Sequence, residues 1–429
     1  MKIFIGILFL LVNIVACNIG LNGIVTAAIL GALCVWFILL ERKRGVAKEI
    51  YLLELMCYVW SSSWRSFMGT PFASLPLPWF YIIGAFLMMF AIVPMLWKKS
   101  KTVVYVFSLL LLGIVPTIFS PDVIEALSFY ITVAFCILIP VAIEQKADLT
   151  DENRDLVINS FVNATVIAGV FLIAQAVIQL IFNYNFVTGK TPEILGGNRI
   201  MAVLMFEDIS SAMIAFAASA MMLLKRFNKT ALIKILILVV AMALSSSRTG
   251  FAAFIIAFGI YVLFGVNKKH RVKLVIAFGL LAVSAVAVYA RVRGIDSLSS
   301  MLDDSGRISG YIASIKVWIK QPIFGFGFSD DVLAATMGEP IPHFALLKIL
   351  VEGGIIYFIA MAAYLLNIII LGIKSKSQFG LYALLTTLIG SCFIPSLFET
   401  KFVCIIVAII MLESTATRAL RKEKNIDAE

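Results

Sequence analysis

The sequence predicts an all-α, polytopic integral membrane protein, and its composition and the length of its apolar runs are the two observations behind that prediction. Of its 429 residues, 62% are hydrophobic and 14% are charged, and the mean hydropathy is +1.03. Soluble domains average about 45–50% apolar and about 25% charged residues, so a soluble core could not bury this excess. The apolar runs are continuous over a bilayer-spanning length, which favours helices over the short alternating strands of a membrane barrel.

Continuous apolar runs predict about 12–14 transmembrane helices. The runs lie at residues 3–15, 24–40, 50–64, 77–97, 103–119, 123–143, 156–182, 209–224, 232–244, 251–266, 274–289, 344–373, 380–394 and 403–412. The first run also follows Lys2 and ends before Cys17, as a lipoprotein-type signal peptide would. We favour a first membrane helix, because a second apolar run follows at once, as in a helical hairpin.

Basic residues cluster in short loops that all fall on one side of the membrane when about 14 helices are assumed. These loops lie at residues 42–48, 98–101, 225–229, 268–273, 374–376 and 418–424. Positively charged loops stay in the cytoplasm, so both termini are predicted to be cytoplasmic. The net charge of +10 is then a topology signal and gives no reason to expect a nucleic-acid partner.

The predicted spans divide the chain into three parts. Residues 1–290 hold transmembrane helices 1–11 with an outer loop at 183–208, and residues 291–343 form a large extracytoplasmic loop. Residues 344–429 hold transmembrane helices 12–14 and a cytoplasmic tail. Both long outer loops carry arginines, although the rule that sets the topology places positive charge in the cytoplasm. The topology does not explain these arginines, which favours a functional role for some of them.

The large loop is expected to contain an interfacial amphipathic helix. Acidic and hydroxyl residues at 303–305 can cap a helix that starts near Arg307, and Gln321-Pro322 ends it. Such a helix, with Trp318 at its edge, lies naturally in the membrane interface. Its apolar face would carry Ile308, Tyr311, Ile312, Ile315 and Ile319. A tight turn is predicted at 325–328, where two glycines alternate with phenylalanines.

Three arginines are candidates for binding a phosphorylated substrate. Arg248 lies at 245–250 between two apolar runs, Arg199 follows two glycines, and Arg307 opens the amphipathic helix. A guanidinium is always charged and can bind phosphate oxygens through two parallel hydrogen bonds. For Arg248 the alternative is a snorkelling interfacial arginine, and for Arg199 it is a solvated loop.

His343 and Glu352 are candidates for acid–base and supporting roles. Histidine can act as a general base near neutral pH, and the alternative is a hydrogen-bonded interfacial histidine. Glu352 lies inside an apolar run, where a carboxylate is costly and marks either a functional site or a structural partner for an arginine. The six cysteines form no CxxC pair, the two histidines lack a cluster of other ligands, and no nucleotide-binding motif occurs, so no metal or cofactor is expected.

The motifs of the second half resemble the O-antigen polymerase/O-antigen ligase superfamily in kind and in order. They are the 245–250 segment before an apolar helix, Gly306-Arg307 with Trp318, the stretch from Gln321 to Gly327, Pro342-His343, and Leu350-Val351-Glu352-Gly353-Gly354. The resemblance covers roughly residues 199–354. It implies a GT-C-like bacterial glycosyltransferase of the cytoplasmic (inner) membrane, which acts at the outer face on glycans carried by undecaprenyl diphosphate and needs neither a nucleotide sugar nor a metal.

The resemblance also implies roles for individual residues. In the family, arginines at the positions of Arg199, Arg248 and Arg307 are associated with the diphosphate and with catalysis, and a histidine at the position of His343 with activation of the acceptor. The histidine is often followed by asparagine, whereas Phe344 follows it here. Glu352 is expected to support the site, and the expected transfer inverts the anomeric centre.

Two activities share these expected residues. A polymerase joins repeat units of a lipopolysaccharide O-antigen, a capsule or an exopolysaccharide, whereas a ligase moves the finished glycan to lipid A core or another acceptor. We favour the polymerase, because polymerases are diverse in sequence and Phe344 suits a divergent member. Such an enzyme would work with a chain-length regulator and a flippase. The rival from another class is a lipid-linked sugar flippase or secondary transporter, which would need paired charges near the midplane.

Overall fold

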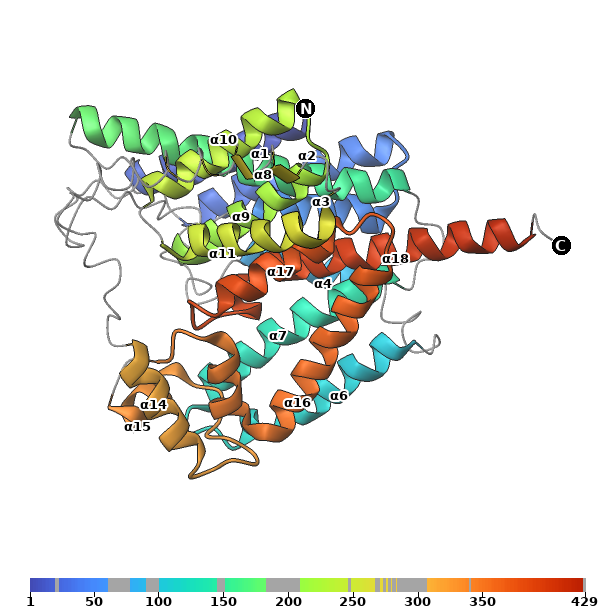
Figure 1. Cartoon of the computed structure of the whole chain (residues 1–429). Coiled ribbons are helices and arrows are strands. Elements are labelled where there is room, and N and C mark those ends of the chain that lie inside the picture. Colours follow the sequence, from blue (N-terminus) through green and yellow to red (C-terminus); the bar gives the residue numbers. More distant parts are fainter. Residues whose placement is uncertain are drawn as a thin grey trace. The chain divides into compact units, whose positions relative to one another are not determined.

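The computed structural model describes residues 1–19, 23–60, 78–89, 100–144, 151–182, 209–245, 248–266, 307–338 and 341–426, with a few single positions between 271 and 283. Within these ranges the chain folds into helices and contains no strand, which confirms the predicted all-α class (Figure 1). The chain divides into two compact units. The first is Met1–Ile83 with Asp155–Asp303, and the second is Gly84–Arg154 with Asp304–Glu429.

The described parts of the predicted apolar runs coincide with helices, while most of 274–289 and the ends of 50–64 and 77–97 lie outside the described residues. Within the described ranges, five helices are long and apolar enough to cross a membrane. They are α2 (Gly23–Lys43), α6 (Lys101–Ile118), α7 (Val123–Glu144), α8 (Asp151–Phe182) and α16 (Ala345–Lys374). The multi-pass membrane class is therefore confirmed, whereas the exact number of spans and their orientation stay predictions.

In the first unit, α9 packs against the two helices that follow it, and the first three helices contact one another. Besides α2 and α8, the helices that lie mainly in this unit are α1 (Lys2–Ile19), α3 (Lys48–Val59), α9 (Ile209–Lys225), α10 (Lys229–Leu244) and α11 (Arg248–Ile260), which continues as a π-helical turn, η3 (Tyr261–Gly265). A Cβ at Gly250 would lie 2.5 Å from the Cβ of Met213, so glycine lets the start of α11 lie close to α9.

A lysine at the start of α1 joins three helices of the first unit. The Lys2 Nζ lies 2.9 Å from Glu41 Oε2 of α2 and 2.6 Å from Glu54 Oε1 of α3. The Ser160 hydroxyl of α8 donates to the same Glu54 oxygen at 2.8 Å. Buried charges are tolerated when they are paired and hydrogen-bonded, so these contacts give Glu54 structural partners. The first apolar run is thus packed into this unit as a helix.

In the second unit, α16 packs against several other helices, and α7 packs against α6 and α18. Besides α6, α7 and α16, the unit contains α14 (Arg307–Trp318), α15 (Asp330–Met337), α17 (Phe379–Ser391), a 3₁₀ turn η5 (Phe398–Thr400) and α18 (Phe402–Ile426). Helix α4 (Pro78–Met89) crosses the boundary between the units in sequence. The cysteines whose side chains are described are free, as expected: Cys34, Cys57, Cys136, Cys392 and Cys404.

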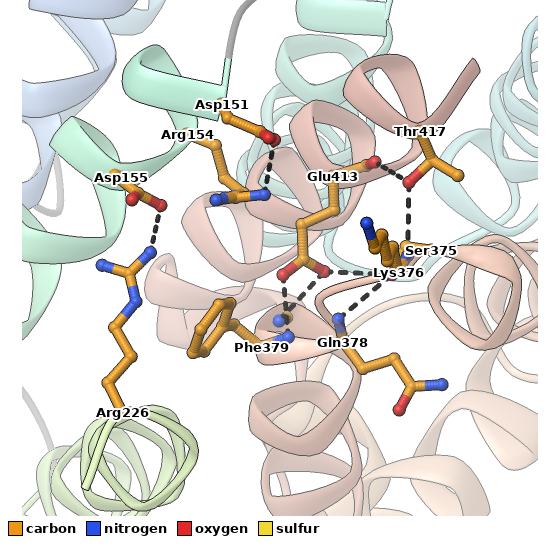
Figure 2. A network of polar contacts seen from close by, with 11 residues as sticks. Asp151, Arg154, Asp155, Arg226, Ser375, Lys376, Gln378, Phe379, Glu413 and Thr417 are labelled. Carbon is orange, nitrogen blue, oxygen red and sulfur yellow. Dashed lines mark hydrogen bonds and ion pairs between the residues drawn. The ribbon is translucent and has the colours of Figure 1, made fainter. Parts of the chain in front are cut away.

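A buried carboxylate caps α17 from a different helix. Glu413 of α18 is 1% exposed, and its two oxygens accept hydrogen bonds from the backbone N–H groups of Phe379 (2.7 Å) and Gly380 (3.3 Å) (Figure 2). These N–H groups open α17, where a helix has unpaired donors and the positive end of its dipole. The Ser375 hydroxyl adds a third hydrogen bond to Glu413 at 3.4 Å. This capping fixes the start of α17 against α18.

Candidate active site

Helix α16 is interrupted, and the turn that follows α14 fills the interruption. Gly354 has φ 70° and ψ 177° inside the helix, which breaks the regular backbone pairing. The turn supplies partners: the Gly327 N–H donates to the Glu352 carbonyl at 2.9 Å, and the Ile355 N–H donates to the Pro322 carbonyl at 2.9 Å. Two motifs that are far apart in sequence therefore form one backbone-bonded assembly. We call it the glycine lock, and it comprises residues 322–327 and 351–355.

Glycine is required where the two backbones of the lock meet. Gly325 has φ 72°, and a Cβ at this position would overlap the backbone of Glu352. A Cβ at Gly354 would likewise overlap the backbone of Ile323. Positive φ is open to glycine and strained for other residues, so conformation and close approach demand the same residue type. The glycines of both motifs are thus explained by this contact.

Phe328 anchors the lock to the neighbouring helices. Its buried ring lies 4.6 Å from the Phe129 ring of α7 and 5.0 Å from the Tyr357 ring of α16, measured between centroids. Gly327 has φ 94°, and a Cβ there would lie 2.5 Å from the Cα of Ser120, just after α6. The lock therefore joins the turn after α14 to α6, α7 and α16. The predicted tight turn at 325–328 is confirmed, and its docking on α16 is new.

Arg307 is the first residue of α14, and this helix ends at Trp318, before Gln321-Pro322, as predicted. The helix buries Gly310, Ser314 and Val317, and it packs against α16 and α15. Its isoleucines face away from this contact and are 45–63% exposed: Ile308, Ile312, Ile315 and Ile319. The helix thus buries one face against the protein and exposes an apolar isoleucine face, and its location in the membrane interface stays a prediction. The expected cap at 303–305 lies outside the described residues.

His343 lies two residues before the first residue of α16 and is connected to α14 through Tyr311. The Tyr311 hydroxyl donates to the backbone carbonyl of His343 at 3.1 Å, and the Tyr311 ring lies 6.3 Å from the ring of Phe344. Tyr311 follows Arg307 by one helical turn, so the two residues share a face of α14. One side chain therefore links the helix that begins with Arg307 to the predicted base. Phe344, which departs from the family pattern, packs against that same side chain.

A set of charges near His343 was not predicted from the sequence. Lys348 of α16 is 2% exposed, and its Nζ lies 2.6 Å from Asp330 Oδ1 of α15 and 5.5 Å from the centre of the Phe129 ring. The sequence offered a signal, because Lys348 is a charge inside a predicted span. A charge inside an apolar run is also the signal that selects Glu352, so the same signal could have selected Lys348.

The charges continue onto α7. Glu125 Oε1 accepts a hydrogen bond from the Asp330 N–H at 3.1 Å, and Glu125 Oε2 accepts one from the Ser329 hydroxyl. Ser329 also caps α15 by accepting a hydrogen bond from the Val332 N–H at 3.3 Å. We call Glu125, Ser329, Asp330 and Lys348 the outer charge network, after the side on which the topology prediction places it.

The other predicted site residues are placed only in part. Arg248 is the first residue of α11 in the first unit, and its side chain lies outside the described part of the chain. Arg199 lies outside the described residues altogether. Glu352 is 1% exposed and adjoins the break in α16. In the described ranges, no group of three or more His, Cys, Asp and Glu side chains is arranged to hold a metal ion.

These observations define a multi-pass, all-α membrane protein whose second unit carries a helix that begins with Arg307 and a histidine just before a long apolar helix. Residues 233–362 match the family model described as O-antigen ligase. This match supports the O-antigen polymerase/O-antigen ligase superfamily that the motifs resemble. The matched segment contains Arg248, Arg307, His343 and Glu352. A comparison with curated proteins gave no match.

Proposed function

We propose that this protein is a membrane glycosyltransferase that polymerises undecaprenyl-diphosphate-linked oligosaccharide repeat units at the outer face of the bacterial cytoplasmic membrane. The observation that carries the proposal is the family match at 233–362, which contains four of the five predicted site residues. The hydrogen bond from Tyr311 to His343 supports it further, because it joins the Arg307 helix to the proposed base. The products would be an O-antigen, a capsule or an exopolysaccharide.

The proposed reaction is a displacement at the anomeric carbon of the donor sugar. The acceptor hydroxyl attacks that carbon and loses its proton to His343, while the bond to the diphosphate oxygen breaks and undecaprenyl diphosphate leaves. Attack opposite the leaving group inverts the anomeric centre. Arg307 and Arg248, with Arg199, would stabilise the negative charge that develops on the diphosphate, an effect that is strongest in a site shielded from water. No metal takes part in this proposal.

Glu352 is proposed as a supporting residue. Its backbone carbonyl belongs to the glycine lock, and its carboxylate lies in the apolar helix that starts just after His343. A buried carboxylate at this position can bind and orient an arginine of the site. Its substitution should therefore change both stability and turnover, unlike substitution of Arg307.

An O-antigen ligase is the second candidate, and the name of the matching family favours it. The ligase would use the same arginines and histidine but would transfer the finished glycan to lipid A core or another acceptor. A flippase or secondary transporter is the rival from another class. A transporter would need paired charges near the midplane, whereas the buried Glu54 of the first unit is paired with Lys2, the first residue of α1, and so lies level with the end of that helix.

The test is a reaction with purified protein in nanodiscs and a defined undecaprenyl-diphosphate-linked repeat unit, followed by mass spectrometry of the products. A ladder of glycans that differ by one repeat unit supports the polymerase. A single transfer to added lipid A core, without a ladder, supports the ligase instead. Absence of any new glycosidic bond with either acceptor contradicts both enzymes and leaves the transporter.

The proposed setting follows from the same substrate. Both termini would lie in the cytoplasm, with the loop at 291–343 on the outer side, where flipped lipid-linked repeat units are presented. A flippase would supply the substrate, and a chain-length regulator would act on the growing polymer. Labelling of single cysteines introduced near Lys316 with a membrane-impermeant reagent tests this orientation in intact cells.

A further inference from the structure

The outer charge network has no role in the reaction described above. Lys348 is 2% exposed and lies in the first turn of an apolar helix. Burying a charged side chain carries a large desolvation cost, and a well-packed apolar residue in its place is often neutral or stabilising. A buried lysine at this position is therefore a poor means of stabilising the fold. Charged groups in membrane segments more often serve function, so its location has to be explained.

The network joins the two helices that flank His343 in sequence. Asp330 is the first residue of α15, which ends at Gly338 in a left-handed cap (φ 64°), and the chain then leads to His343. Lys348 follows His343 by five residues. The ion pair between Lys348 and Asp330 therefore fixes the start of α15 to the first turn of α16.

The position of this pair is set by a third helix. Glu125 of α7 accepts hydrogen bonds from the Asp330 N–H and the Ser329 hydroxyl, which ties the start of α15 to α7. The Phe129 ring, one turn further along α7, lies under the Lys348 ammonium. A cation over an aromatic face is attracted to it, and more strongly when both are shielded from water. The Lys348 side chain thus contacts both α7 and α15, and these two contacts define its position.

We propose that Lys348 is a positioning residue for His343. Its ion pair with Asp330 fixes the geometry of α15 and the start of α16, and this geometry sets the place from which the histidine receives the acceptor proton. The inference rests on the proposed function, because it takes His343 as the group that meets the acceptor. Lys348 does not itself touch the reacting atoms.

The kinetic test uses Lys348→Met, which removes the charge and keeps a flexible apolar stem. We expect kcat to fall roughly 10- to 100-fold, because a displacement of about 1 Å at a reacting group can cost 100-fold. The donor KM should stay within about twofold, since the diphosphate contacts are unchanged. Lys348→Arg keeps the charge and should restore most of kcat. Asp331→Asn is the matched control, because this neighbouring carboxylate is exposed.

The structural test is hydrogen exchange of the α15 amides in nanodiscs, and it does not depend on glycan transfer. Exchange should be faster in Lys348→Met than in Lys348→Arg or wild type. If Lys348→Met does not fold, Asp330→Asn provides the same comparison with a milder change, because this side chain is 39% exposed. Unchanged exchange overturns the proposal. If the wild type is active and kcat is unchanged in Lys348→Met and Asp330→Asn, the positioning proposal is also overturned. If the wild type itself is inactive, the proposed function is overturned.

Discussion

The two ends of α16 use buried charge in different ways. Near its C-terminal end, the carboxylate of Glu413 accepts hydrogen bonds from two backbone N–H groups and one hydroxyl. Near its N-terminal end, Lys348, which follows His343 by five residues, forms an ion pair with Asp330. The 30 residues of α16 lie between these regions, which at about 1.5 Å each and with the break at Gly354 separates them by at most about 45 Å.

The two regions differ in role, because the contacts of Glu413 stabilise the fold and the ion pair of Lys348 is proposed to serve turnover. A carboxylate that accepts hydrogen bonds from backbone donors fixes a helix end, and its loss leaves those donors unsatisfied. An ion pair between side chains contributes little net stability, so its retention beside the predicted site points to a geometric role. Substitutions at the Glu413 end should lower stability and leave turnover unchanged. Substitutions at the His343 end should lower turnover more than stability.

Substitutions in the glycine lock should lower stability and turnover together, so the two effects should be least separable there. Gly354→Ala introduces a Cβ that overlaps the Ile323 backbone at a φ that disfavours alanine. We expect a loss of at least about 3 kcal/mol in the free energy of unfolding, from strain and overpacking together. Thermal unfolding in detergent measures this loss. Gly338→Ala is the control, because Gly338 also has positive φ but no neighbouring atom within 4 Å of an added Cβ. Equal unfolding temperatures for the two variants contradict the lock.

Arg307→Ala should have the largest effect on turnover alone. Removal of a group that stabilises developing negative charge typically costs about 10²–10³ in rate. Arg307 is partly exposed at the start of α14, so the unfolding temperature should change little. The measurement is the initial rate of glycan transfer per folded molecule. Lys316→Ala, an exposed cation on the same helix, should retain the wild-type rate; an equal loss there argues for a general charge effect.

Glu413→Ala should show the opposite behaviour. The backbone N–H groups of Phe379 and Gly380 lose their acceptor, at about 1–3 kcal/mol for each buried donor left unsatisfied. Glu413→Gln keeps one acceptor oxygen and should fall between the alanine variant and wild type. Thermal unfolding and transfer rate are measured on the same preparations. A Glu413→Ala protein that is as stable as the exposed control Lys374→Ala excludes the capping role.

Tyr311→Phe should have the smallest effect. The variant removes one neutral hydrogen bond, from the Tyr311 hydroxyl to the His343 carbonyl, worth about 0.5–1.5 kcal/mol. If that bond orients the histidine, the transfer rate falls by up to about tenfold. The packing of the ring on Phe344 is kept, so stability should fall by no more than about 1.5 kcal/mol. A wild-type rate shows that the backbone at His343 is held without Tyr311.

The helices could be predicted because their signal is local. Apolar runs of bilayer length coincide with helices, and the boundaries of α14 follow from Arg307 at its start and Gln321-Pro322 after its end. The exposed isoleucine face of α14 was also predicted from spacing alone. Each of these features depends on residues within a few turns of one another, and a single sequence contains that information.

The tertiary contacts of the site could not be predicted in the same way. The glycine lock forms between backbone groups of residues about 30 positions apart, and backbone hydrogen bonds leave no pattern in side-chain type. Glycines in both motifs were noticed, but only the structure pairs them. The cap by Glu413 connects α18 to α17 and was hidden because the predicted last span ended at residue 412.

The predicted site residues differ in what now supports them. Arg307 and His343 are connected through Tyr311, and Glu352 takes part in the lock through its carbonyl. The roles of Arg199 and Arg248 stay predictions from their motifs. Lys348 had the same sequence signal as Glu352, a charge in an apolar run, and it should be weighed equally in related chains.

The most direct test of the account is the initial rate of glycosidic-bond formation by three preparations in nanodiscs. They are the wild type, Arg307→Ala and Glu413→Gln, each supplied with the same lipid-linked repeat unit and normalised to folded protein. The account predicts equal rates for wild type and Glu413→Gln and a rate lower by about two orders of magnitude for Arg307→Ala. A wild-type rate in Arg307→Ala, or no bond formation by the wild type, contradicts it.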